Sequence, residues 1–147
     1  MIPFGKLFHT NAPSAVLVIR FLVGGVFLLE GMKKFLFADQ WGAGRFARIG
    51  IPAPHTLGPL VAVVEIVCGL LLLAGLLTRI ASIFLIIDIS VAIVSTKIPI
   101  LLKNGFWPME AEARTDYSML MGLVFLLIVG AGTRSLDAWL SSRTGHG

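Results

Sequence analysis

Cysteine and histidine are scarce in this sequence of 147 residues. The single cysteine, Cys68, excludes an internal disulfide, a CxxC pair and a thiolate metal cluster, and nothing near it in the sequence would activate its thiol. The three histidines, His9, His55 and His146, fall in expected loops or tails, which excludes a bis-histidine haem between helices. No flavin or nucleotide fingerprint is present. We therefore expect no metal site, no covalently bound cofactor and no electron carrier within this chain.

Charged residues are also few, at 14% of the chain against about 25% in ordinary globular proteins. Hydrophobic residues reach 56%, and the mean hydropathy is +0.91. A soluble domain needs polar residues to cover its surface, and this chain has too few. The composition therefore predicts an integral membrane protein. Its net charge of +4 does not indicate nucleic-acid binding, because the basic residues sit at the ends of apolar runs, where they meet lipid headgroups.

Four apolar runs are long enough to cross a bilayer as helices, since a helix rises about 1.5 Å per residue and the hydrocarbon core is about 30 Å thick. Short connections make consecutive runs antiparallel. The predicted fold class is all-α integral membrane, an antiparallel four-transmembrane-helix bundle in one domain over residues 1–147. The expected spans are 14–37, 57–77, 80–98 and 116–132.

Several boundaries follow from local signals. Thr56 and Thr115 are expected to cap the second and fourth spans, and the third should end before Pro99. Residues 99–114 should form a mixed interfacial segment. The first run is interrupted by Arg20 and lacks a small-residue cleavage site, so we expect it to remain in the mature protein rather than act as a cleaved signal.

The second span is central to the predicted arrangement of the helices. Glu65, near the middle of this span, is the only charged residue in it. A charge at the bilayer centre costs about 2.5–3.5 kcal/mol on insertion scales, so Glu65 should face protein or water and have a partner. Gly69 falls on the same helix face as Glu65, and Gly24 and Gly31 share a face with Arg20. Small residues let helix backbones approach closely. We expect these three glycines and Glu65 to face the interior of a left-handed bundle.

The intramembrane charges fall into two layers by their expected depth. Arg20 and Asp88 lie at similar depth and predict a pair, with Glu65 as the other possible partner of the arginine. The second layer contains Glu30, Glu65, Lys33 and Lys34, covered by Trp41, Trp107 and Tyr117. No catalytic residue is assigned, and the candidate ligand-binding residues are Arg20, Glu30, Lys33, Glu65, Asp88, Trp41 and Trp107.

Two interpretations of these charges stay open. In the first, they are structural: Glu30 and Lys34 form an i,i+4 pair, and Asp116 is favoured at a helix N-terminus by the helix dipole. In the second, they form a polar cluster that binds a quinone or another lipophilic molecule between the helices, since ionisable residues inside a membrane mark functional sites.

The chain resembles the DoxX family of small bacterial membrane proteins from about Val16 to Leu140. The order and spacing of several short motifs carry this resemblance: Arg20…Gly24…Phe27…Gly31…Lys33, Phe46…Gly50-Ile51-Pro52, Glu65…Gly69-Leu70-Leu71-Leu72, Gly75…Thr78-Arg79 and Gly130-Ala131-Gly132…Ser135-Leu136-Asp137. The resemblance implies a four-helix bundle in a bacterial inner membrane. It also implies a link to quinone-dependent oxidoreductase systems and redox-stress complexes, usually as a small subunit.

Two functional hypotheses follow. The first is a small membrane subunit of a quinone-linked oxidoreductase system, with quinone as candidate ligand and the electron carrier on a partner subunit. The alternative is a non-enzymatic lipophile-binding or assembly protein, in which the charges shape a cavity and specify helix register. A homo-oligomer is compatible with both. The connection after the first span and the one after the third carry more Lys and Arg than the opposite side, which places them in the cytoplasm.

Overall fold

The structure, a computed structural model, describes residue 8 and residues 13–144, and this part of the chain is helical and contains no strand. The expected N-terminal tail lies largely outside the described residues, as do His9 and His146. The all-helical prediction is confirmed for the described part. Its elements are Val16–Leu36 (α2), Ala38–Trp41 (α3), Ala43–Arg48 (α4), Pro54–Ala74 (α5), Thr78–Ala92 (α6), Ile93–Lys97 (a π-helical turn, η1), Ile98–Asn104 (α7), Phe106–Val129 (α8) and Leu136–Thr144 (α9).

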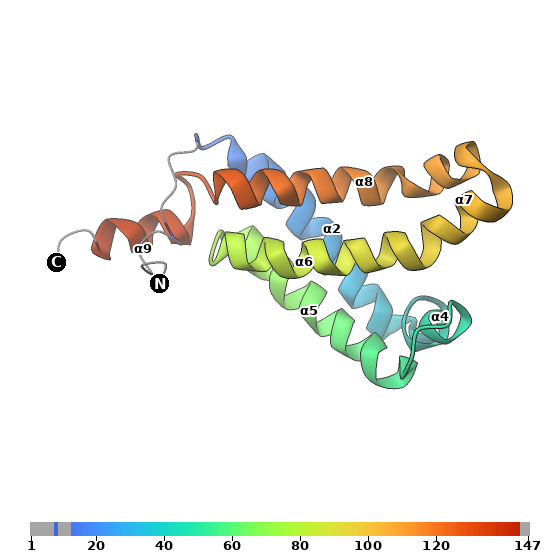
Figure 1. The fold of residues 1–147 in the computed structure, drawn as a ribbon. Coiled ribbons are helices and arrows are strands. Elements are labelled where there is room, and N and C mark those ends of the chain that lie inside the picture. Colours follow the sequence, from blue (N-terminus) through green and yellow to red (C-terminus); the bar gives the residue numbers. More distant parts are fainter. Residues whose placement is uncertain (1–7, 9–12, 145–147) are drawn as a thin grey trace, which may run out of the picture.

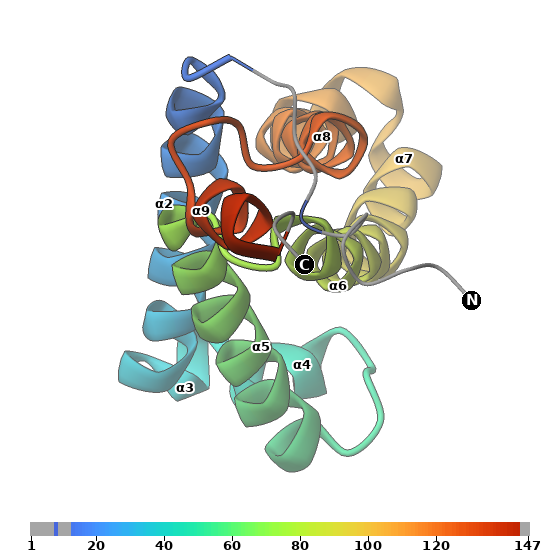
Figure 2. The ribbon, with the colours of Figure 1, turned by 90° about the vertical axis from the view of Figure 1, so that its left-hand side faces the viewer.

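The long helices associate as two pairs, α2 with α5 and α6 with α8 (Figure 1). The pairs lie close together at the end of the molecule near α9, and they diverge toward the other end, where α4 and α7 lie (Figures 1 and 2). A shared apolar core joins the pairs; its fully buried members include Val23, Leu72, Leu85, Leu123 and Leu126. The two pairs are therefore furthest apart at the α4 and α7 end.

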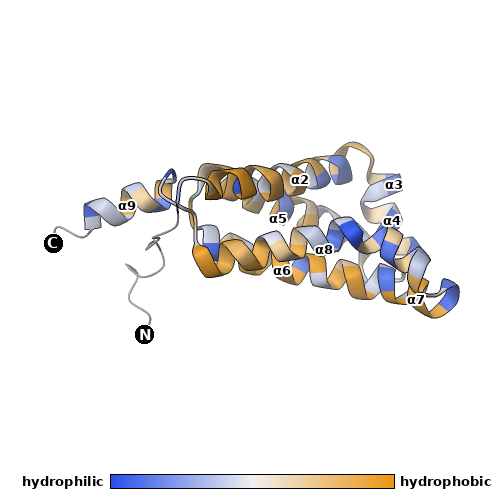
Figure 3. Ribbon diagram, turned by 90° about the horizontal axis from the view of Figure 1, so that it is seen from above, coloured by the Kyte–Doolittle hydropathy of each residue, from blue (hydrophilic) through white to orange (hydrophobic). Residues whose placement is uncertain are grey.

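Two stretches of helix in the described residues are long and apolar enough to cross a membrane, Pro54–Ala74 and Thr78–Asn104. Only 33% and 17% of their apolar windows are buried within the protein. Figure 3 shows apolar residues along α6 and along the half of α8 nearest α9, whereas hydrophilic residues gather toward α3 and α7. Apolar helices exposed to this extent are expected where lipid, not protein, covers the remaining surface.

The third apolar run continues further than its sequence predicts. Helix does not stop before Pro99 but runs from α6 through η1 and α7 to Asn104. Proline removes one backbone donor and its ring crowds the carbonyl four residues earlier, here that of Ser95. The wider π-helical turn at Ile93–Lys97 lies where this crowding falls, and it lets the helix pass the proline without ending.

The other predicted boundaries also need correction. α5 begins at Pro54, so Thr56 and His55 lie in its first turn, and Thr56 is not the N-cap. α8 begins at Phe106, so Thr115 lies inside a helix and does not cap it. The segment 99–114 is therefore mostly helical. Sequence patterns place the polar first half of α8 outside a membrane span, but polarity alone does not end a helix.

Small residues allow the close contact between α2 and α5, as predicted. Gly24, Gly31 and Gly69 are all buried. A Cβ added to Gly24 would lie 2.9 Å from the Gly69 carbonyl oxygen, and one on Gly31 would lie 2.7 Å from the Ala62 carbonyl oxygen. Neither clash could be relieved by a side-chain rotation, because the obstacle is backbone. The inward orientation of Glu65 is confirmed as well, since only 4% of it is exposed.

Arg20 joins α2 to the ends of two other helices. Its side chain is 1% exposed and donates four hydrogen bonds, all to main-chain carbonyl oxygens. Nε and Nη2 bond to Leu72 (2.8 Å) and Leu73 (2.8 Å) in the last turn of α5. Nη1 bonds to Ala131 (3.1 Å) and Arg134 (2.6 Å) in the α8–α9 connection. A cation at the C-terminal end of a helix also interacts favourably with the helix dipole.

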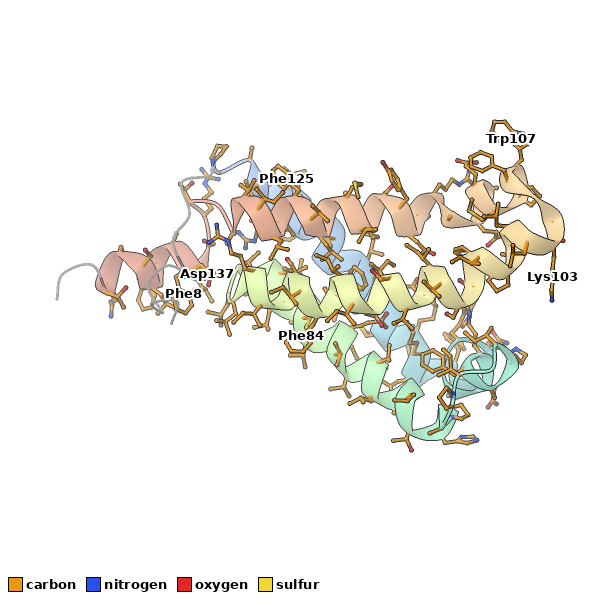
Figure 4. The ribbon with its side chains drawn as sticks, in the orientation of Figure 1. Phe8, Phe84, Lys103, Trp107, Phe125 and Asp137 are labelled. Carbon is orange, nitrogen blue, oxygen red and sulfur yellow. The ribbon has the colours of Figure 1, made fainter. Side chains whose placement is uncertain are left out.

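Asp137 has the complementary role at the start of α6. Its two carboxylate oxygens accept hydrogen bonds from the backbone N–H groups of Leu77 (2.7 Å) and Thr78 (3.0 Å), and its own N–H donates to the Gly75 carbonyl (2.9 Å). Figure 4 shows Asp137 between α9 and the beginning of α6. Leu77 has a positive φ of 50°, an uncommon conformation for leucine that these bonds hold in place. Asp137 also attracts the Arg20 guanidinium.

The predicted pairing of Arg20 with Asp88 is wrong. Arg20 is satisfied by carbonyl groups near α9, while Asp88 interacts with Glu65 and Lys34. Depth along the helices suggested the pair, but the last turn of α5 and the α8–α9 connection each bring two carbonyl groups within hydrogen-bond reach of the guanidinium.

The two adjacent glycines of α2 provide a matched test of helix contact. Gly24→Ala should lower the thermal unfolding temperature in detergent, because overpacking typically costs about 1–3 kcal/mol and the clash is with backbone. Gly25→Ala should leave that temperature unchanged or raise it, since nothing lies within 4 Å of the added Cβ. Circular dichroism on heating measures both. Equal destabilisation by the two substitutions would contradict the close α2–α5 contact.

Arg20→Ala should destabilise the protein by about 3 kcal/mol or more, because each hydrogen bond to a charged group contributes about 1.5–3 kcal/mol. Arg20→Lys should recover only part of this loss, since one ammonium cannot reproduce the planar fork. Adding Asp88→Asn to Arg20→Ala should give additive effects in the same unfolding measurement, because the two residues share no partner. If Asp88→Asn instead recovered part of the stability lost in Arg20→Ala, the result would support a pair between Arg20 and Asp88.

Candidate ligand-binding cavity

A cavity of about 680 Å³ opens between the two helix pairs where they diverge. This volume lies in the range of about 300–1,000 Å³ that is usual for small-molecule sites. Its walls come from α2, α4, α5, α6, η1 and α8, and they combine apolar side chains with a concentration of charge. The charged lining residues are Glu30, Lys33, Lys34, Arg45, Glu65, Asp88, Lys97, Glu112 and Asp116.

The most buried polar group of the cavity joins three helices. Lys34 of α2 donates from Nζ to Glu65 Oε2 of α5 at 2.5 Å, and the exposed fractions of these side chains are 13% and 5%. The carboxyl group of Asp88 of α6 lies close enough to that of Glu65 for the two to interact. The partner that the sequence predicted for Glu65 is therefore Lys34, which comes from the predicted second layer.

The contact between Glu65 and Asp88 has a chemical consequence. Two ionised carboxylates in contact repel each other, and a proton on one of them removes this repulsion. With that proton, the two carboxyl groups carry one negative charge, which Lys34 balances. The group can therefore donate a hydrogen bond from a carboxylic acid or an ammonium, and it can accept one on a carboxylate oxygen. It can do so on the wall of a cavity that also has apolar lining residues.

A second ion pair lies across the other helix pair. Lys97 of η1 approaches Asp116 of α8 with an Nζ–Oδ2 distance of 3.3 Å, and Lys97 is buried. The π-helical turn that accommodates Pro99 contains Lys97 and so fixes the position of this lysine on the cavity wall. Asp116 is thus held by a specific partner and not only by a helix dipole, because α8 starts well before it.

The third charged group surrounds Trp41 at the end of α3. Lys33 Nζ lies 4.3 Å from the centre of the indole ring and also bonds to Glu30 Oε1 at 2.7 Å. Arg45 Cζ of α4 lies 5.5 Å from the same ring centre. Cation–π contacts of this kind contribute about 0.5–1 kcal/mol at exposed sites. Glu30 therefore pairs with Lys33 at i,i+3 and not with Lys34, which is used by Glu65.

The predicted site residues divide into two groups. The structure brings Glu30, Lys33, Trp41, Glu65 and Asp88 to the cavity wall. Arg20 is instead bonded to the last turn of α5 and to the α8–α9 connection. Trp107 does not cover the polar layer: it is 76% exposed, contacts Phe106 ring to ring at 5.2 Å, and points away from the bundle (Figure 4). Tyr117, at 62% exposed, does not cover it either.

The charged cavity residues that were not among the predicted ligand-binding residues are Lys34, Arg45, Lys97, Glu112 and Asp116. Lys34 was placed in the second polar layer, and Asp116 was assigned to a helix N-terminus. A partial signal was present for Lys97, because a proline inside a long apolar run marks a local change of helix geometry, and Lys97 lies just before Pro99. No comparable signal identifies Arg45. Within residues 13–144 and residue 8, no group of three His, Cys, Asp or Glu side chains could hold a metal ion.

Comparisons with known proteins agree with the membrane assignment. The chain is 54% identical over 144 residues to the uncharacterized membrane protein Rv3486 of Mycobacterium tuberculosis, with 94% of this chain and 88% of that protein covered. It is 27% identical over 124 residues to the putative oxidoreductase CatD of Bacillus subtilis, with 84% and 85% covered. No solved structure matches the chain. The DoxX family model matches residues 15–98, from the start of α2 to the end of η1, and the chain is a membrane protein of the DoxX family.

Proposed function

We propose that this protein is a small subunit of a quinone-linked oxidoreductase system and that it binds the quinone in the cavity between its helix pairs. The observation that carries the proposal is the Lys34–Glu65–Asp88 group on the wall of a cavity of about 680 Å³. A quinone has an apolar body and carbonyl oxygens that accept hydrogen bonds. The apolar lining suits the body, and the ammonium or the protonated carboxyl suits the carbonyl oxygen.

The redox part of the proposal rests on two further points. The relative in Bacillus subtilis is named a putative oxidoreductase, although the identity is only 27%. Neither the sequence motifs nor the described side chains of this chain include a recognisable electron carrier. The electrons would therefore come from a cofactor on a partner subunit, and this chain would position the quinone and supply protons from its carboxyl pair.

The membrane arrangement that suits this role has all four long helices crossing the bacterial inner membrane, with α4 and α7 at the cytoplasmic side. α2 and α8 carry charges that a lipid-facing helix would not tolerate, but Arg20, Lys34 and Asp116 have partners inside the protein. Internal pairing of this kind is what allows charged helices to remain in a membrane. The basic residues around α3, α4 and α7 favour this orientation.

Quinone binding should depend on the carboxyl pair. Glu65→Gln and Asp88→Asn should each weaken the binding of a short-chain naphthoquinone by roughly tenfold, because each removes a charged hydrogen-bonding group. Glu110→Gln is the matched control, since Glu110 is an exposed acid of α8 outside the cavity. Titration of the purified protein in detergent, followed by tryptophan fluorescence, measures the affinity. Equal affinities in the wild type and all three variants would contradict the proposed site.

A partner that carries the redox cofactor should co-purify with the tagged protein in a mild detergent. Visible absorption of the purified material and mass spectrometry of its proteins and lipids provide the measurement. A colourless preparation of this chain alone, without quinone but with another bound lipid, would instead support a non-enzymatic lipophile-binding or assembly protein. The complete pairing of Lys34, Lys97 and Lys33 with carboxylates is the observation that favours this second candidate.

A further inference from the structure

Arg45 is the cation of the cavity whose charge is not balanced by the surrounding protein. The three lysines on the cavity wall each have a carboxylate partner, in the pairs Lys33–Glu30, Lys34–Glu65 and Lys97–Asp116. In the part of the chain that the structure describes, Arg45 makes neither a hydrogen bond nor an ion pair through its side chain, and its contact is with the Trp41 ring. The planar guanidinium therefore keeps its five N–H donors available.

The position of Arg45 makes this free guanidinium significant. It is half-buried, it lines the cavity, and it sits in the short helix α4 close to the basic end of the molecule. Arg48, one turn later in the same helix, is exposed and donates to the carbonyl oxygens of Asp39 (2.9 Å) and Gln40 (2.8 Å). Two arginines of one helix thus differ: the second secures the fold of α3, and the first faces the cavity with unused donors.

The wall beside Arg45 is apolar. The next lining residues along the chain are Phe46, Ile49, Ile51, Leu57, Leu60 and Val61. A guanidinium fork matches two oxygens of a phosphate or carboxylate group, which bind it with charge-assisted hydrogen bonds. A ligand with an anionic group bound to this fork and a hydrocarbon chain along the apolar wall would contact both the guanidinium and the apolar lining. A free inorganic anion would contact only the guanidinium.

We propose that Arg45 binds the phosphate oxygens of an anionic membrane lipid and that the lipid's acyl chain lies along the apolar wall of the cavity. The proposal does not require that a quinone binds, because Arg45 is not part of the Lys34–Glu65–Asp88 group, although both groups line the same cavity. Among the other charged lining residues, the exposed Glu112 of α8 makes no ion pair with Arg45 within the described residues. Anionic lipids are abundant at the cytoplasmic face of a membrane, where the basic end of this protein is proposed to lie.

Trp41 provides the signal for a test, because anion binding to Arg45 changes the charge next to its ring. In a protein in which Trp107 and Trp139 are replaced by Phe, Trp41 is the remaining tryptophan. This variant is reconstituted in phosphatidylcholine nanodiscs and titrated with short-chain phosphatidylglycerol, with short-chain phosphatidylcholine, or with inorganic phosphate at constant ionic strength. We expect a saturable change of Trp41 fluorescence with phosphatidylglycerol and none with phosphatidylcholine.

Substitutions distinguish a site from general attraction to charge. Arg45→Gln should weaken phosphatidylglycerol binding roughly ten- to a hundredfold, and Arg45→Lys should weaken it less. Lys103→Gln also removes one positive charge, from a side chain that points away from the molecule at the end of α7 (Figure 4), and should leave the affinity unchanged. Thermal unfolding of each variant identifies any loss of fold.

The outcomes separate the sources of the anion. A response to phosphate but not to phosphatidylglycerol, lost in Arg45→Gln, would overturn the lipid assignment. Equal affinity for the two lipids, or the same loss in Arg45→Gln and Lys103→Gln, would overturn the anion site itself. Loss of quinone binding in Glu65→Gln with phosphatidylglycerol binding intact would support the independence of the two sites.

Discussion

The cost of placing a charge away from water governs this structure more than any other interaction. Each buried charge is matched within a few ångströms, but by two different means. At the end near α9, Arg20 is matched by carbonyl groups at the end of α5 and in the α8–α9 connection, and Asp137 by N–H groups at the start of α6. At the other end, lysines are matched by carboxylates. The bonds of Arg20 and Asp137 to main-chain groups hold the helix pairs together near α9. The pairs of lysine and carboxylate line the cavity where the helix pairs separate.

The polar end of the cavity is held by few contacts. Lys34 and Glu65 join α2 to α5, Lys97 and Asp116 join η1 to α8, and the contact between Glu65 and Asp88 bridges the two helix pairs. A ligand that takes a hydrogen bond from Glu65 or Asp88 would therefore compete with the bridge itself. Binding at either carboxyl group would in that case be linked to the separation of the helix pairs.

Much of this could be predicted from the sequence, for a physical reason. A charge in an apolar run must face inward, which correctly oriented Glu65, and glycines on its face indicate backbone contact, which correctly identified Gly24 and Gly69. The partners of Arg20 could not be predicted, because carbonyl groups occur at every residue and carry no sequence signal. Depth along a helix suggested Asp88 instead. The proline rule failed at Pro99, because a π-helical turn removes the clash that would end the helix.

The four acceptors of Arg20 differ in when they become available during synthesis. Arg20 is in the first long helix, Leu72 and Leu73 follow about fifty residues later, and Ala131 and Arg134 come more than a hundred residues later. While the chain is still emerging from the ribosome, the guanidinium can reach at most half of its final partners. The first helix pair can form early through its glycine contacts, but the charge within it stays incompletely bonded until nearly the whole chain has been made. The C-terminal connection thus acts as the closing step of assembly, and a chain that stops before residue 131 carries an exposed defect that membrane quality control could recognise.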